Sequence, residues 1–187
     1  VSIPAGHSVA LVGGSGSAAA HVLRRLASHR LVLRVARGLW MNGMAGDISP
    51  YEVVRPLVAP WPAYVSLYSA LADYGLVQEI PQIIYAVTSS RVRRYRTPLG
   101  VFHFHHLPQR LLWGYEMKRA GRVAYPMAEP EKAFLDLAYL ALVPRSGLKF
   151  PRRRGRRWAL SAQKLRRYAA RFDFPPLAAF LRGVGGV

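Results

Sequence analysis

A glycine-rich turn near the start of the chain has the spacing of a dinucleotide-binding loop. Residues 9–12 predict a short strand, and Gly14, Gly16 and Ala19 give the spacing G-x-G-x-x-A before a helix. Such a turn lets the backbone approach a pyrophosphate at a helix N-terminus. The fingerprint also needs an acid after the second strand, and residues 31–41 contain none. A nucleotide-binding enzyme that uses Gly13–Gly16 is therefore the alternative interpretation.

Three histidines lie close together in the middle of the chain and resemble metal ligands. His103 and His105 would share one face of a strand, which is a workable geometry for zinc, and His106 follows directly. No Cys, Asp or Glu nearby completes a tetrahedral set. We therefore expect no metal site, and we interpret these histidines as exposed residues of a hairpin strand.

A third group combines two acids and a lysine on one expected helix. Glu131, Lys132 and Asp136 have the residue types of an acid–base group. Acids in a first helical turn also stabilise the helix dipole, and a surface lysine is simply solvated. The second interpretation is simpler, so we expect no catalytic residues, no cofactor and a protein that is not an enzyme.

The densest charge in the chain is a short arginine cluster. It is followed by further basic residues with Trp158 and Tyr168 among them, a composition that suits nucleic acid. An acidic protein partner and a solvated loop are the other interpretations. The cluster consists of Arg152, Arg153, Arg154, Arg156 and Arg157.

The whole chain has a strong excess of positive charge. Its 187 residues include 27 Lys and Arg against nine Asp and Glu, a formal net charge of +18. Such a field favours polyanions or an acidic partner. There is no cysteine and no apolar run near the ~20 residues of a membrane span. We expect a cytoplasmic protein that does not enter a membrane.

The first part of the chain has the pattern of a DNA-reading unit. A helix is expected at 17–28, with an apolar stripe of Ala19, Val22, Leu23 and Leu26, followed by a hairpin that turns at Arg37-Gly38. This pattern predicts a winged helix-turn-helix whose first helix is shortened or absent. The expected DNA-binding residues are Ser17, His21, Arg24, Arg25, Ser28, Arg30, Arg34 and Arg37.

The remaining chain predicts a second unit, and the fold class expected is α+β. We place the winged helix-turn-helix at 1–43, a linker with one short helix at 44–62, and a mixed α/β domain at 63–187. The expected elements of that domain are a helix at 63–74 capped by Gly75, a strand at 83–88, a hairpin of 91–96 and 101–105, and helices at 129–140, 161–172 and 176–181.

The order of several short motifs resembles the AbiEi antitoxin family. They are Arg34-x-x-Arg37-Gly-Leu-Trp40, Tyr64-Val-Ser-Leu-Tyr-Ser-Ala-Leu71, Tyr74-Gly-Leu76, Tyr85-Ala-Val-Thr88, Arg96-Thr-Pro-Leu-Gly100, Phe102-His-Phe-His-His106, Gly114-Tyr-Glu116 and Pro130-Glu-Lys-Ala-Phe-Leu-Asp136. The resemblance implies a transcriptional autorepressor that binds duplex DNA at operator inverted repeats. It also implies a C-terminal antitoxin domain opposing a nucleotidyltransferase toxin, either directly or through the toxin's nucleic-acid substrate.

Overall fold

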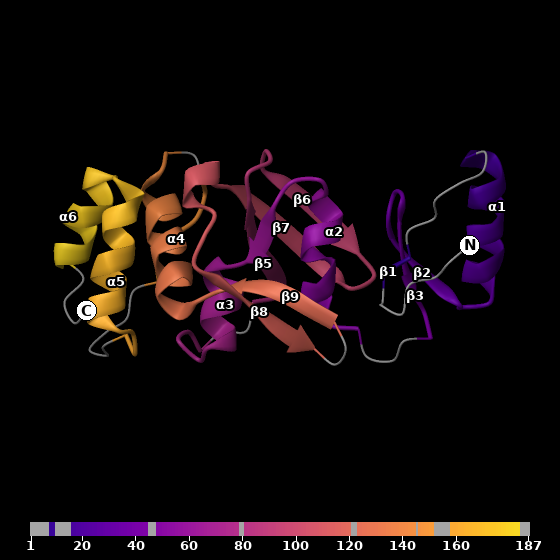
Figure 1. Ribbon diagram of the computed structural model, residues 1–187, viewed down its shortest axis with the longest axis horizontal. Coiled ribbons are helices and arrows are strands. Elements are labelled where there is room, and N and C mark those ends of the chain that lie inside the picture. The colour runs from indigo at the N-terminus through magenta and orange to yellow at the C-terminus, as the bar shows by residue number, and fades with distance from the viewer. Residues whose placement is uncertain are drawn as a thin grey trace.

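The protein is a mixed α+β structure with two separate sheets (Figure 1). The computed structural model describes residues 8–9, 16–44, 48–78, 81–120, 123–144, 146–151 and 158–183. The expected fold class is thus confirmed at the level of α+β. No helix in these ranges is long and apolar enough to cross a bilayer.

The N-terminal unit is a small sheet with one helix, at the right-hand end of Figure 1. Helix α1 (Gly16–Ser28) is followed by strands β2 (Val32–Ala36) and β3 (Leu39–Asn42), and β1 (Ser8–Val9) pairs with the far side of β3. All pairs are antiparallel. The helix and the hairpin therefore lie where the sequence pattern placed them.

The hairpin turns at Arg37-Gly38, as expected. Gly38 has φ 77°, a left-handed conformation that glycine adopts without steric cost. The register places Arg34 opposite Trp40 and Ala36 opposite Leu39, so Val35 is an extra residue in β2. This bulge lets both Val32 and Val35 be buried on one strand, which a strict alternation of side chains would not allow.

Helix α1 packs on β2 through a slightly different face from the one predicted. Leu23 is buried, and Ala20 and Ala27, at helical spacing from it, are partly buried. Val22, which the apolar stripe included, is 52% exposed. The prediction was wrong for Val22 because its position lies off the face that meets β2.

The large sheet has six strands in the order β6-β7-β5-β4-β9-β8. Two pairs, β4 with β9 and β5 with β7, are parallel, and the others are antiparallel. The hairpin expected in this region is confirmed as β6 and β7. The strands are β4 (Ala63–Val65), β5 (Ile83–Thr88), β6 (Arg93–Thr97), β7 (Gly100–His106), β8 (Tyr115–Ala120) and β9 (Val123–Ala128).

Helices and turns pack around this sheet. The 3-10 turn Pro50–Val53 has a capping box made by Ser49 and Glu52 and leads into α2. At the opposite end of the molecule, α5 and α6 both pack against α4 (Figure 1). The helices are α2 (Val54–Val58), α3 (Leu67–Asp73), α4 (Pro130–Leu142), α5 (Ala162–Ala169) and α6 (Pro175–Gly183), with further 3-10 turns at Gln109–Leu111 and Ala170–Phe172.

The segment predicted as a linker also supplies core residues. Val54, Leu57 and Val58 of α2 are buried in the same hydrophobic cluster as the large sheet. Val35 and Met41 of the hairpin belong to that cluster as well. The hairpin and α2 therefore share one hydrophobic core with the large sheet.

The helix expected at 63–74 was wrong at its start. Residues 63–65 form β4, which lies between β5 and β9 and is buried on both faces. The pairing of a central strand overrides the helical spacing of its apolar residues. The chain then turns at Leu67, whose φ is 56°, into α3. Gly75, with φ 66°, ends the helix as predicted.

Candidate functional site

The basic residues of α1 lie on one exposed face. His21, Arg24, Arg25 and Ser28 follow at spacings of three, four and seven, and all four are exposed. Their hydrogen bonds within the described ranges go to the helix itself: Arg24 Nε donates to the Ala20 carbonyl at 3.3 Å, and Ser28 Oγ to that of Arg25 at 2.8 Å. This face is free to meet a partner.

The hairpin adds further arginines to the same unit. Arg37 is exposed at the turn, and Arg34 is exposed on β2 with its guanidinium 5.7 Å from the centre of the Trp40 ring. Arg30 lies exposed in the turn between α1 and β2 with φ 58°. Helix, turn and hairpin thus each contribute exposed positive charge.

Several predicted residues fall outside the described structure. Ser17 lies in the first turn of α1, but its side chain is not among those described. Gly13, Gly14 and the whole arginine cluster of residues 152–157 lie outside the described ranges. The nucleotide-binding alternative and the role of that cluster therefore stay predictions.

A network of polar side chains is buried around α4, next to β4 of the large sheet. The ammonium of Lys132 contacts Asp136 Oδ1 and donates to Tyr64 Oη at 2.9 Å. Asp136 Oδ2 accepts hydrogen bonds from Tyr64 Oη at 3.0 Å and from Ser66 Oγ at 2.8 Å. The sequence-based interpretation of Lys132 as a surface residue was wrong, because Lys132 and Asp136 are both 0% exposed.

Aromatic rings complete the surroundings of Lys132. Its Nζ lies 4.9 Å from the ring centre of Trp113, 5.0 Å from Phe172 and 5.5 Å from Tyr64. A cation over ring faces is stabilised by their quadrupoles, the more so when water is excluded. The methylenes of Lys132 also lie against Gly114, where an added Cβ would come within 3.1 Å.

Burial governs the protonation of this group. Burial lowers the pKa of Lys132, and the charge of Asp136 opposes that change. Burial likewise raises the pKa of Asp136, against the effect of Lys132, Ser66 and Tyr64. None of these four side chains has more than 1% exposure. These buried contacts join β4 to α4.

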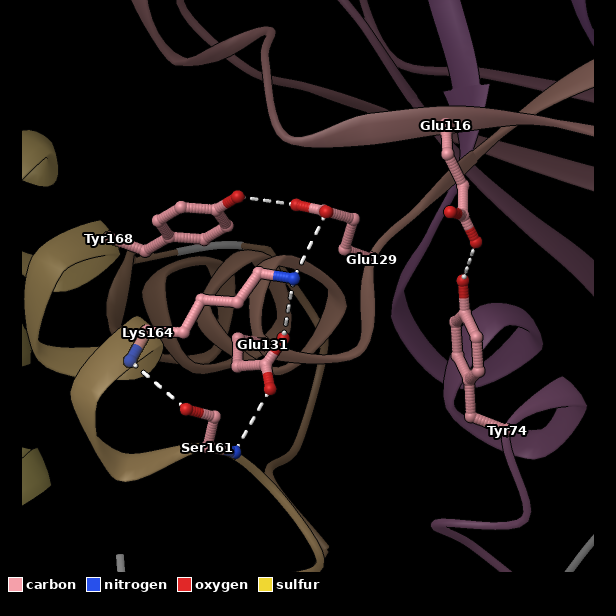
Figure 2. A network of polar contacts seen from close by, with 7 residues as sticks. All are labelled: Tyr74, Glu116, Glu129, Glu131, Ser161, Lys164 and Tyr168. Carbon is pink, nitrogen blue, oxygen red and sulfur yellow. Dashed lines mark hydrogen bonds and ion pairs between the residues drawn. The ribbon is translucent and has the colours of Figure 1, made fainter.

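A second polar network ties α5 to the start of α4 (Figure 2). Lys164 lies between Glu129 and Glu131, with Nζ–O distances of 3.0 and 3.3 Å. Tyr168 Oη donates to Glu129 Oε2 at 2.5 Å, and the backbone N–H of Ser161 donates to Glu131 Oε1 at 2.9 Å. Tyr168 and Lys164 hold the pKa of Glu129 below its usual value, against the effect of burial.

The three histidines of β7 differ in their exposure to solvent. No cluster of three or more His, Cys, Asp or Glu able to hold a metal occurs in the described part of the chain. His106 is exposed as expected, but His105 is 8% exposed. Burial lowers the pKa of His105 to about 4, with His103 and Arg94 adding to the effect. The interpretation as exposed residues was therefore wrong for His105.

No protein-family model matches the chain, and no curated protein matches it.

Proposed function

We propose that the protein is a DNA-binding antitoxin that represses its own operon and counters a nucleotidyltransferase toxin. The observation that carries the DNA-binding part is the exposed basic face of α1 beside a hairpin with an arginine at its turn. A helix whose outer face carries His21, Arg24 and Arg25 suits the major groove, and a hairpin can reach the adjacent backbone.

Charge within the N-terminal unit supports this proposal. Residues 1–43 contain five arginines and no acid. Arginine suits phosphate contacts because its planar guanidinium forms paired hydrogen bonds. In this proposal Arg24, Arg25, Arg30, Arg34 and Arg37 contact phosphates, while Ser17, His21 and Ser28 lie nearer the base edges.

The antitoxin part rests on the sequence motifs and on the charge of the rest of the chain. Residues 91–187 contain 21 Lys and Arg against five acids. This excess lies outside the DNA-reading unit and needs another polyanionic or acidic target. Replacing Arg153, Arg154, Arg156 and Arg157 by Glu should abolish rescue of cells that express the toxin, without unfolding the protein.

The DNA-binding part is tested by mobility shifts on the region upstream of the gene at several salt concentrations. Replacing Arg24 and Arg25 by Ala should weaken binding and reduce the slope of log K against log salt by about two, since each neutralised phosphate on duplex DNA contributes about 0.9. The matched control replaces Arg166 and Arg182, which are also exposed arginines on helices. Equal slopes for the two double variants would refute α1 as the DNA surface.

A further inference from the structure

Three neighbouring strands of the large sheet bring basic and aromatic side chains into one row. Arg94 on β6 is the register partner of His103 on β7, which is in turn the partner of Tyr85 on β5. Direct partners across strands share one face of a sheet. The ring of Tyr85 lies 5.8 Å from that of His103 and 6.0 Å from that of His105. We call this surface the Tyr85–Arg94 face.

Its outer part is open to solvent. Arg94 and Arg96 are exposed, while His103 and Tyr85 are partly buried. β6 is the last strand of the sheet, so no further strand covers the row at that end. The face therefore passes from a rim of two guanidinium groups to a more enclosed patch of aromatic rings.

The face carries positive charge without compensating acids. Residues 80–115, which include all three strands, contain no Asp or Glu, and Arg94 and Arg96 lie on this face. Neither Arg94 nor Arg96 has an ion pair within the described ranges, whereas Lys118 and Lys164 on other elements both do. Exposed arginines without a protein partner, beside aromatic rings, are typical of surfaces that meet a polyanion.

One polar atom of this face is buried and unpaired. Nε2 of His105 is buried and has no hydrogen-bond partner among the described residues. A buried polar atom left unpaired costs free energy. Burial lowers the pKa values of both His103 and His105, which favours the neutral form of each ring. A neutral imidazole offers one donor and one acceptor.

We propose that the Tyr85–Arg94 face binds a single-stranded polynucleotide, with phosphates on Arg94 and Arg96 and a base against His103 and Tyr85. A base can stack on a side chain only when it is not stacked on adjacent bases. Single strands offer such bases and a duplex does not. Rings beside the arginines favour a nucleic acid over an acidic peptide, since carboxylates gain nothing from ring faces and would select charged histidines. This surface is separate from α1 and does not depend on the duplex-binding proposal.

The test measures fluorescence anisotropy of a labelled oligothymidylate and of a labelled duplex with the full chain. Replacing Arg94 and Arg96 by Ala should weaken single-strand binding by roughly tenfold or more, as expected for the removal of hydrogen bonds to charged groups. The salt slope should fall by about 0.7 for each phosphate of the single strand that the variant no longer neutralises. His103→Ala should weaken binding by about tenfold, and His103→Phe should restore it because the ring is retained.

Two control variants test whether the loss of single-strand binding is specific to the Tyr85–Arg94 face. Arg166→Ala with Arg182→Ala removes the same charge from exposed helix positions and should leave single-strand binding within about twofold, since screening weakens distant charges. Arg24→Ala with Arg25→Ala should weaken duplex binding only. Circular dichroism of each variant establishes that it is folded. Loss of duplex binding alone in the α1 variant, and of single-strand binding alone in the β6 variant, separates the two proposals.

Three outcomes would overturn the inference. They are the absence of oligothymidylate binding by the unmodified protein, an equal loss in the Arg166/Arg182 control, or a loss in His103→Phe as large as in His103→Ala. A polyglutamate that binds the face when the oligonucleotide does not would identify an acidic protein as the partner instead.

Discussion

Helices α1 and α4 both carry charged residues, and they use them in opposite ways. On α4, Glu131, Lys132 and Asp136 are buried, and the lysine and both acids contact groups on other elements. On α1, Arg24 and Arg25 are exposed and form no ion pair within the described ranges. Charges of the first kind hold the fold together, whereas charges of the second kind are available to another molecule. Four effects of decreasing size are expected from this difference.

The largest effect is expected for Asp136→Asn. This change leaves the shape of α4 intact but removes the negative charge that Lys132 contacts in the interior. An uncompensated buried charge destabilises a protein by about 3–5 kcal/mol. Urea denaturation followed by circular dichroism measures the loss. A loss below about 1 kcal/mol would mean that Lys132 is neutral in the folded protein.

The next effect concerns the pH dependence of stability. The pKa of His105 is lowered to about 4 in the folded protein, from an ordinary value near 6.5. Between these values the unfolded chain binds more protons, so the free energy of unfolding falls as the pH falls from about 6.5 towards 4. We expect about 2 kcal/mol of this fall between pH 6.5 and 4.5 to come from His105.

Urea denaturation of the unmodified protein and of His105→Gln at both pH values measures this contribution. Glutamine does not titrate, so the variant should lose less stability on acidification. Parallel curves for the two proteins would show that His105 has an ordinary pKa.

A smaller effect is expected at the contact between α4 and α5. Tyr168→Phe removes the hydrogen bond to Glu129 and leaves the ring that packs against Trp113. Because the site is partly open to solvent, we expect a loss of about 1 kcal/mol. Unfolding curves at neutral pH provide the measurement. A loss as large as that of Asp136→Asn would mean that this network contributes as much to the free energy of unfolding as the buried pair of Lys132 and Asp136.

The smallest effect on stability is expected for Arg24 and Arg25, the residues that the proposed function places on DNA. Replacing Arg24 and Arg25 by Ala should change the free energy of unfolding by less than about 0.5 kcal/mol, because exposed side chains away from special features contribute little. Thermal unfolding of the variant and of the unmodified protein tests this. A clear loss of stability would mean that these arginines hold α1 in place, and would weaken the comparison with α4.

Local signals in the sequence predicted much of the fold. The Arg37-Gly38 turn, the β6–β7 hairpin and the helix that begins at Pro130 each depend on neighbouring residues, and all three occur in the structure. The strand at 63–65 was missed because it is defined by its partners β5 and β9, which lie far along the chain.

The buried group around α4 was missed for the same reason. Tyr64 lies 68 positions before Lys132, and nothing local links them. One signal was available: residues 133–138 are apolar apart from Asp136, so α4 is apolar on nearly all sides and is expected to be buried. Lys132 and Asp136 are four positions apart and so lie next to each other on this helix. On a buried helix this spacing predicts a buried ion pair.

Gly43 has a consequence for how α1 is presented. Its N–H donates to the Leu31 carbonyl at 2.9 Å, and an added Cβ would come within 2.3 Å of the Arg30 carbonyl oxygen. The end of the hairpin is therefore held directly against the end of the helix. Any larger side chain at position 43 must push the two apart. The distance between the arginines of α1 and Arg37 therefore depends on Gly43, and a larger side chain there is expected to change it.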